Sequence, residues 1–282
     1  MFRILHAKML LVALVLFFTA CGKNSYESLL KSRDLLLKEE KAKEYYAKKK
    51  YAKALPLIED VYTYLRGTAK AEELYYLRAK CLYKLEFYYE AAYHFDQFTK
   101  LFPNSDKEEE CSFLSALCHY KNAPPVNLSQ AETYEAIESL KAFSEYYPES
   151  YLMDSTNMLL DKLRYKQETK MYNWANLYYK MGQLNAAQVA FKLVLRDFPG
   201  NPYQEDIQYK IVKAAYKFAK KSVEHKKMER YQRVMEDYYA FVDNFPESKK
   251  MRELSLFYKE AQRVLEKESN YTEDQEEEQE EY

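Results

Sequence analysis

An aromatic residue followed by proline and a short polar turn occurs four times in this chain at nearly even spacing. The four segments are FPNS from Phe102, YPES from Tyr147, FPGN from Phe198 and FPES from Phe245. Their prolines are 45, 51 and 47 residues apart. Because proline cannot continue a helix, each segment predicts the end of one helix in a recurring unit. The chain is therefore predicted to be a repeat protein, built from similar units stacked in a row.

Each proline follows a helical pattern that holds a small residue and, four positions later, a large apolar one. Ala91 and Phe95 precede Pro103 in this way, and Ala187 holds the small position before Pro199. These offsets resemble the tetratricopeptide repeat, in which two helices form a hairpin that ends at a proline. Glycine is scarce, at 4 of 282 residues, and the sequence shows no alternating strand pattern. We predict an all-α fold, a right-handed α-solenoid of about five tetratricopeptide (TPR) helical hairpins with a C-terminal capping helix.

The repeat pattern gives the expected organisation of the chain. The TPR solenoid is expected over residues 33–268, with repeats near 35–68, 72–105, 109–150, 168–201 and 207–248 and a cap at 252–267. The third repeat has about eight extra residues, Asn122 to Ser129, and their two prolines predict an extended loop. Residues 269–282 form an acidic tail that we predict to be disordered. The tail is either an interaction arm for a basic partner or a solvated segment.

The N-terminal segment predicts export and lipid anchoring. Residues 1–20 have a basic start and then an uncharged apolar stretch of ten residues, which is typical of a secretory signal peptide. Cys21 follows two small residues and resembles the lipobox cysteine of bacterial lipoproteins, which implies acylation of Cys21, palmitate included. Three acyl chains exceed the two signals that stable anchoring needs. Residues 21–32 are then a lipidated tether. Gly22 in place of aspartate implies, by the same resemblance, sorting to the outer membrane.

Composition argues against several classes of function. Removal of residues 1–20 changes the net charge from −1 to −3, whereas a nucleic-acid-binding surface needs a basic excess. Phosphate-binding glycine motifs are absent from the sequence, and the histidines and cysteines lack the spacing of metal ligands. Cys81, Cys111 and Cys118 are read as buried, unpaired residues, with a Cys81–Cys118 bridge as the alternative. We expect no enzymatic activity, no cofactor, no metal and no small-molecule substrate.

Aromatic residues recur where the first helix of each TPR hairpin faces the inner groove. Such rings, with lysines beside them, suit an extended peptide that carries a carboxylate. The alternative is that the rings pack between neighbouring repeats. The expected peptide-binding residues are Tyr46, Tyr76, Lys80, Tyr83, Phe113 and Tyr120, and the expected partner-binding residues of the C-terminal repeats are Tyr172, Asn176, Tyr179 and Phe218.

The anchor, the repeat number and the block from Ala136 to Pro199 together resemble the BamD family of outer-membrane β-barrel assembly lipoproteins. Within that block, a hairpin is followed by a Tyr-Pro turn, a long helix rich in leucine and arginine, and a YY…G turn. The resemblance implies a non-catalytic, lipid-anchored protein at the periplasmic face of the outer membrane. It also implies two partners, namely the POTRA region of the barrel-forming BamA subunit and unfolded outer-membrane proteins.

Two other functions are compatible with the same repeats. A TPR scaffold lipoprotein could serve a different envelope complex, such as cell-wall enzymes or secretion and gliding machinery. An outer-membrane lipoprotein of the starch-utilisation type also contains such repeats, but it carries a large ligand-binding lobe for which 282 residues leave no room.

Overall fold

The computed structural model describes the backbone of residues 26–280 and the side chains as far as Lys267. Every regular element in that range is a helix, so the predicted all-α class is confirmed. The signal segment and the lipidation site at Cys21 lie outside the described residues. The chain divides into two compact units. The first contains residues up to Pro124 and 129–160, and the second contains Pro125–Leu128 and the chain from Asp161 onward.

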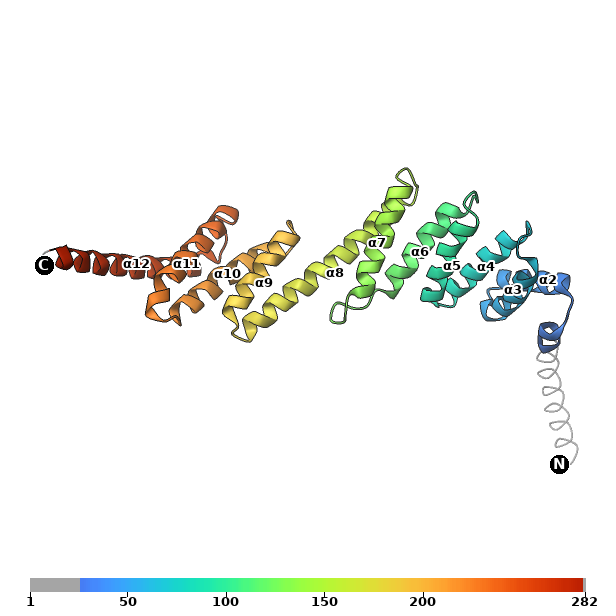
Figure 1. Ribbon diagram of the computed structural model, residues 1–282, viewed down its shortest axis with the longest axis horizontal. Helices are drawn as coiled ribbons and strands as arrows, with labels where there is room; N and C mark the ends of the chain where they lie inside the picture. Colours follow the sequence, from blue (N-terminus) through green and yellow to red (C-terminus); the bar gives the residue numbers. More distant parts are fainter. Residues whose placement is uncertain (1–25, 281–282) are drawn as a thin grey trace, which may run out of the picture. The chain divides into compact units, whose positions relative to one another are not determined.

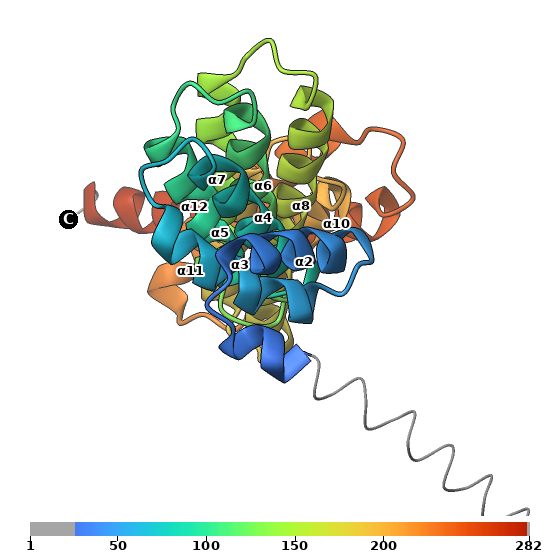
Figure 2. The same ribbon diagram turned by 90° about the vertical axis from the view of Figure 1, so that its right-hand side faces the viewer.

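The first unit is a row of antiparallel helix hairpins (Figure 1). A short helical segment at residues 26–31 precedes them. The hairpins pair α2 (Leu35–Ala47) with α3 (Tyr51–Leu65), α4 (Ala71–Lys84) with α5 (Tyr88–Leu101), and α6 (Glu108–Asn122) with α7 (Ala131–Tyr146). In Figure 2, the molecule is turned so that α2 and α3 face the viewer and α4 to α7 follow behind them. The predicted loop is present as the non-helical connection between α6 and α7.

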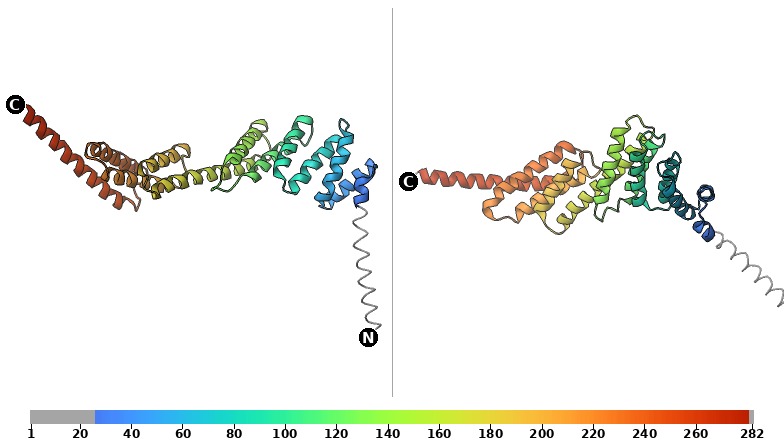
Figure 3. Two further views of the ribbon diagram at one scale, coloured as in Figure 1. Left: turned by 60° about the horizontal axis from the view of Figure 1, so that its bottom comes forward. Right: turned by 45° about the vertical axis from the view of Figure 1, so that its right-hand side comes forward.

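The second unit continues the hairpin pattern. Its helices are the later part of α8 (Met153–Lys180), α9 (Leu184–Asp197), α10 (Gln204–Lys220), α11 (Glu224–Asn244) and α12 (Met251–Glu280). Helix α12 packs on α11 and α10 and then extends past them as a single helix (Figure 3). None of the described helices combines the length and the apolar character needed to cross a membrane.

Two helices differ in length from the sequence-based expectation. Helix α8 begins at Met153, well before the expected start of the fourth repeat at residue 168. Helix α12 continues in the backbone to Glu280, well past the expected end of the cap at residue 267, while the disorder expected for residues 269–282 stays a prediction. Glutamate and glutamine are good helix formers, so a helix already started by the packed residues 251–267 propagates into the acidic segment at little cost.

The aromatic-Pro segments end four helices in the same way. Phe102, Tyr147, Phe198 and Phe245 each donate their backbone N–H to the carbonyl four residues earlier, at 2.8 to 3.0 Å, before the proline stops the helix. Three of these rings also lie against a phenylalanine of the preceding turn, with centroids 5.1 to 5.5 Å apart. The ring therefore closes the end of the hairpin core at the point where the backbone turns.

The small residues of the repeat pattern let the paired helices approach closely. Ala54, Ala91, Ala136 and Ala187 are fully buried. The side chains four positions later, Ile58, Phe95, Leu140 and Phe191, are fully buried as well. Alternation of a small and a large side chain on one helix face allows the partner helix to interdigitate.

The three described cysteines are buried and unbridged, as the favoured reading of the sequence predicts. Burial raises the pKa of Cys81, Cys111 and Cys118 to about 12. A thiol that stays protonated and lacks solvent access is a poor nucleophile and a poor metal ligand. These residues therefore act as small apolar side chains in the hairpin core.

His94 gives the first unit a testable dependence on pH. Its Nδ1 lies 3.0 Å from the Tyr75 hydroxyl, and burial lowers the pKa of His94 from 6.5 to about 4. In the unfolded chain, His94 takes up a proton near pH 6.5, whereas in the folded chain it stays neutral until about pH 4. The contribution of the neutral, buried His94 to the free energy of unfolding is therefore complete above pH 6.5 and is lost as pH falls toward 4. We expect a loss of about 2 kcal/mol across this range, after allowance for partial solvent exposure.

The measurement is urea unfolding of wild type and His94→Gln at several pH values between 7 and 4.5, with amide hydrogen exchange in α4 and α5 as the local readout. His94→Gln should flatten the curve relative to wild type. His119→Gln serves as the matched control because that ring is 29% exposed. Parallel curves for wild type and His94→Gln would contradict the assignment.

Candidate protein-binding surfaces

The first helices of successive hairpins are joined by hydrogen-bonded ion pairs, beginning at α2 and α4. Glu39 on α2 is 8% exposed and accepts from Lys43 at 3.1 Å and from Lys70 at 3.0 Å. Lys43 also reaches Glu73 on α4 at 2.7 Å. Although burial on its own raises it, the pKa of Glu39 is held below its usual value by the two lysines. The buried carboxylate therefore remains charged and links two neighbouring hairpins.

The junction between α4 and α6 contains two of the expected peptide-binding residues. The Tyr76 hydroxyl donates to both carboxylate oxygens of Glu110 at 3.0 Å, and Lys80 lies 2.9 Å from the same carboxylate. Lys80 also stands over the Tyr76 ring, 5.4 Å from its centroid. Burial, and then the bond to Glu110, raises the pKa of Tyr76, so its hydroxyl remains a donor. The carboxylate that a ligand was expected to offer to Lys80 is supplied here by Glu110 of the next hairpin.

The other expected groove rings are partly or fully buried against the second helix of their own hairpin. Tyr46 meets Tyr51 edge-on at 5.4 Å, and Tyr83 meets Tyr88 at 5.7 Å. Phe113 is 9% exposed and lies 5.5 Å from Phe143, whereas Tyr120 is half-buried. These contacts place Tyr46, Tyr83 and Phe113 against the second helix of their own hairpin. The peptide-binding role expected for these rings stays a prediction.

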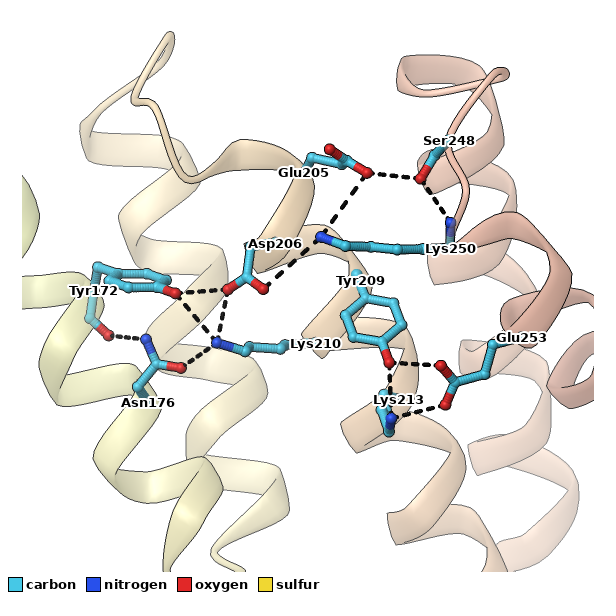
Figure 4. Close-up of polar contacts among 10 residues, drawn as sticks. All are labelled: Tyr172, Asn176, Glu205, Asp206, Tyr209, Lys210, Lys213, Ser248, Lys250 and Glu253. Carbon is cyan, nitrogen blue, oxygen red and sulfur yellow. Dashed lines mark hydrogen bonds and ion pairs between the residues drawn. The ribbon is translucent and has the colours of Figure 1, made fainter.

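A larger polar network joins α8, α10 and α12 in the second unit (Figure 4). The Tyr172 hydroxyl donates to Asp206 at 2.6 Å, and its ring stacks on Tyr203 at 4.2 Å. Lys210 donates to Asp206 at 2.7 Å and to the Asn176 carbonyl oxygen at 2.5 Å. Burial alone would raise the pKa of Asp206, but the Lys210 and Tyr172 bonds lower it below the usual value.

The same arrangement recurs one hairpin further along. Tyr209 donates to Glu253 of α12 at 2.7 Å, and Lys213 reaches both Tyr209 and Glu253 at 2.7 Å. The hydrogen bonds from Lys213 and Tyr209 lower the pKa of Glu253. Tyr216 and Lys220 bind Glu260 in the same way, so a tyrosine and a lysine four residues later share one acid at two points between α10 and α12. With Tyr76, Lys80 and Glu110 the pattern spans both units.

The serine of the aromatic-Pro turn forms a second type of junction. Ser248 accepts from the Lys250 N–H at 3.1 Å and donates to Glu205 of the preceding hairpin at 2.7 Å (Figure 4). Ser105 donates to Glu72 at 2.6 Å in the same manner, and Ser150 donates to Glu109. In the remaining turn Asn201 stands at this position, and its side chain bonds within the turn.

The remaining expected partner-binding residues are also engaged within the unit. Tyr179 accepts a hydrogen bond from Lys217 at 3.2 Å. Phe218 is covered by the guanidinium of Arg230, whose carbon lies 4.0 Å above the ring centroid. The structure brings Tyr172 and Asn176 together in one network, whereas Phe218 belongs to a separate contact with α11.

Sequence reasoning selected Tyr76, Lys80, Tyr172 and Asn176 but missed the acids of these junctions. It also missed the tyrosine and lysine pairs of α10, namely Tyr209 with Lys213 and Tyr216 with Lys220. Glu110 lies in the first turn of α6, Asp206 in the first turn of α10, and Glu253 in the first turn of α12. Acids are favoured there by the helix dipole, so they are easily read as capping residues alone. Their recurrence one repeat after a Tyr-x-x-x-Lys pair is the signal that could have identified the junctions.

Removal of Lys210 should weaken the second unit. Lys210→Met leaves Asp206 without its closest cation and leaves the Asn176 oxygen without its donor, so we expect a loss of about 2 kcal/mol in local stability. Lys217→Met is the matched control on the same helix, because Lys217 donates to the Tyr179 hydroxyl and stands over the Tyr179 ring without a short ion pair among the described residues. Its cost should stay within about 0.5 kcal/mol. Amide hydrogen exchange in α8 to α10 measures the loss of local stability in both variants. Equal losses in Lys210→Met and Lys217→Met would contradict a stabilising role of the network.

Two segments of the chain match models of known protein families. Residues 39–166 match the YfiO family model, described as outer membrane lipoprotein, and residues 171–201 match a tetratricopeptide repeat. The first match covers α2 from Glu39 through α7 and the first half of α8. The second covers the last turns of α8 and all of α9.

Two individual proteins are also similar to this chain. The outer membrane protein assembly factor BamD of Caulobacter vibrioides is 25% identical over 127 residues, which are 45% of this chain and 42% of that relative. The alignment thus spans less than half the length of the relative. The crystal structure of the P58(IPK) TPR domain is 15% identical with a TM-score of 0.39, covering 88% of this chain and 70% of that one. The chain is thus similar over residues 39–166 to the outer membrane lipoprotein family YfiO, over residues 171–201 to a tetratricopeptide repeat, and over 127 residues to BamD.

Proposed function

We propose that this protein is a lipid-anchored component of the outer-membrane β-barrel assembly machinery that binds partners and does no chemistry. The family match over residues 39–166 carries the proposal, because that range follows the hairpins of the first unit. Anchoring through Cys21 would hold the hairpins at the periplasmic face of the membrane. A binding role is supported by the relatives, which are an assembly factor and a TPR domain.

The first unit is the proposed site for unfolded outer-membrane proteins. Helix α4 of its middle hairpin carries Tyr76 and Lys80, and the Lys80 side chain is 19% exposed. Glu110 neutralises that lysine and is itself 38% exposed, so an incoming carboxylate can compete for it. A peptide that ends in an aromatic residue with a free carboxylate would supply both the ring contact and the competing charge.

This competition predicts that removal of the internal carboxylate strengthens peptide binding. Glu110→Gln should bind a short peptide ending in phenylalanine about fivefold more tightly than wild type, because Lys80 is released while the fold keeps a polar partner for Tyr76. Lys80→Met should remove the preference for the free carboxylate over the amidated peptide. Fluorescence anisotropy with both peptides measures the effect.

Glu138→Gln is a suitable control, because Glu138 is 73% exposed and pairs with Lys141 three residues along the same helix. Weaker binding by Glu110→Gln, or equal binding of the free and amidated peptides by wild type, would show that α4 is not a carboxylate site.

The second unit is the proposed contact for the barrel-forming, BamA-like subunit through its POTRA region. Tyr172, Asn176, Tyr179 and Phe218 are the proposed contact residues. They lie on α8 and α10, the two first helices of the hairpins in this unit. Their polar groups are already oriented by Lys210 and Lys217, which favours recognition by a preformed surface.

Co-purification tests the proposal as a whole. The chain is tagged after Tyr282, outer membranes are solubilised in mild detergent, and associated proteins are identified by mass spectrometry. We expect a stoichiometric barrel protein with tandem POTRA domains, together with outer-membrane protein precursors. Recovery of cell-wall enzymes or secretion components instead would replace the assembly role with that of a scaffold for another envelope complex.

A further inference from the structure

Helix α8 carries an exposed apolar stripe that none of the interactions above uses. Trp174, Leu177, Tyr178 and Met181 are 62, 53, 38 and 64% exposed. They stand at positions i, i+3, i+4 and i+7, so they form one continuous line along the helix. Single exposed apolar residues are common, but four large ones in one line, the only tryptophan included, mark a surface that another element covers.

The stripe is not the face by which α8 packs in its own unit. That face holds Ala175, which is fully buried, with Tyr172 and Tyr179 beside Phe191 of α9. The helical period puts residues 174, 177, 178 and 181 on the opposite side. Between residues 172 and 181 the chain is therefore apolar on two sides, and over this stretch only one of them is covered within the described residues.

The same side of α8 is covered further toward its N-terminus. Leu163, eleven residues before Trp174 along this face, is fully buried. Lys170 donates to the backbone carbonyl of Leu128, and to that of Val126 at 3.3 Å, in the inserted loop. The cover therefore stops about one turn before Trp174, and the exposed stripe continues a face that is built to be buried.

The charges around the stripe define what can cover it. Residues 161–182 contain five basic and two acidic residues, although the chain as a whole has a net charge of −1. Lys162, Lys166 and Lys180 lie along one flank by the helical period. Lys180 has no ion pair among the described residues, and with Leu177 and Lys210 it lines an open depression beside the stripe. A covering element with acidic side chains at this flank would be complementary.

We propose that this stripe is a docking surface for an amphipathic helix of a partner protein, with apolar side chains along its centre and Asp or Glu at its flank. The i, i+3, i+4, i+7 line matches the geometry by which two helices pack ridge into groove. A second copy of this chain is a poor occupant, because its own stripe would bring another lysine flank against Lys180.

The test uses Trp174 as its reporter, since it is the only tryptophan in the chain. Two synthetic helical peptides of about 18 residues share one leucine stripe and differ only in glutamate or lysine at the flanking positions. We expect the glutamate peptide to shift Trp174 emission to the blue, to bind at least about tenfold more tightly than the lysine peptide, and to weaken with added salt.

Variants separate the two parts of the proposal while the reporter is kept. Leu177→Lys with Met181→Lys should weaken the glutamate peptide by about tenfold or more. Lys180→Glu should reduce the preference for glutamate over lysine. Leu256→Lys is the matched control, because Leu256 is 62% exposed on α12 and lies outside the stripe. The Leu256→Lys variant should bind the glutamate peptide with the same affinity as wild type.

Three results would overturn the proposal. Equal affinity for the glutamate and the lysine peptide would contradict the proposed acidic flank of the partner helix. An unresponsive Trp174 that already emits as a buried indole in the free chain would show that the chain itself covers the stripe. A blue shift that grows with protein concentration without peptide, together with dimers in light scattering, would make a second copy the occupant. None of these results depends on whether the protein belongs to the barrel-assembly machinery.

Discussion

The hydrogen bond from a tyrosine to a carboxylate of the next hairpin is the interaction on which the rest of this structure depends. A TPR hairpin has two faces and can bury neither by itself, so each must be fixed to its neighbour. Tyr76 with Glu110, Tyr209 with Glu253 and Tyr216 with Glu260 do this at bond lengths of 2.6 to 3.0 Å. A lysine one turn along the tyrosine's helix shares the same acid. At Glu253 the bonds from the lysine and the tyrosine lower the pKa of the carboxyl group, and a charge-assisted bond is roughly twice as strong as a neutral one.

This way of joining hairpins restricts the surface that remains for function. The groups that could recognise a peptide, namely the lysines and the edges of the tyrosine rings, are those that hold the junctions. Any ligand of this face must therefore exchange with an internal acid rather than enter an empty site. Exchange of one carboxylate for another changes the net energy little, which suits transient binding of many different clients better than tight binding of one. The serine contacts at the aromatic-Pro turns are separate from the groove, so the turns can keep the hairpins aligned while such an exchange occurs.

The sequence predicts the helices far better than the use of their faces. Proline spacing and the small residues at Ala91 and Ala187 locate the hairpins because these residues act on the backbone locally. The repeat template also places Tyr76 and Lys80 correctly on a first helix. The template could not show that Glu110 forms an ion pair with Lys80, because the two residues are thirty positions apart in sequence and meet only in the folded chain. The length of α12 escaped prediction for a different reason. Composition alone suggests disorder for an acidic segment, whereas a packed helix that precedes it removes the cost of nucleation.

The stripe on α8 is a clearer case in which the sequence does not predict the use of a helix face. Apolar residues at helical spacing give the same sequence pattern whether the fold buries them or leaves them exposed. Helix α8 has two such lines, and the sequence gives no rule for choosing between them. Packing makes the choice: α9 and α10 cover the line through Tyr172 and Ala175, and the inserted loop covers the opposite line only as far as Lys170. What remains, Trp174 to Met181, differs from the groove in one physical respect. Groove residues have internal partners that a ligand must displace, whereas the stripe residues lose only water on binding. The groove is therefore suited to exchange, and the stripe to a lasting contact driven by apolar burial.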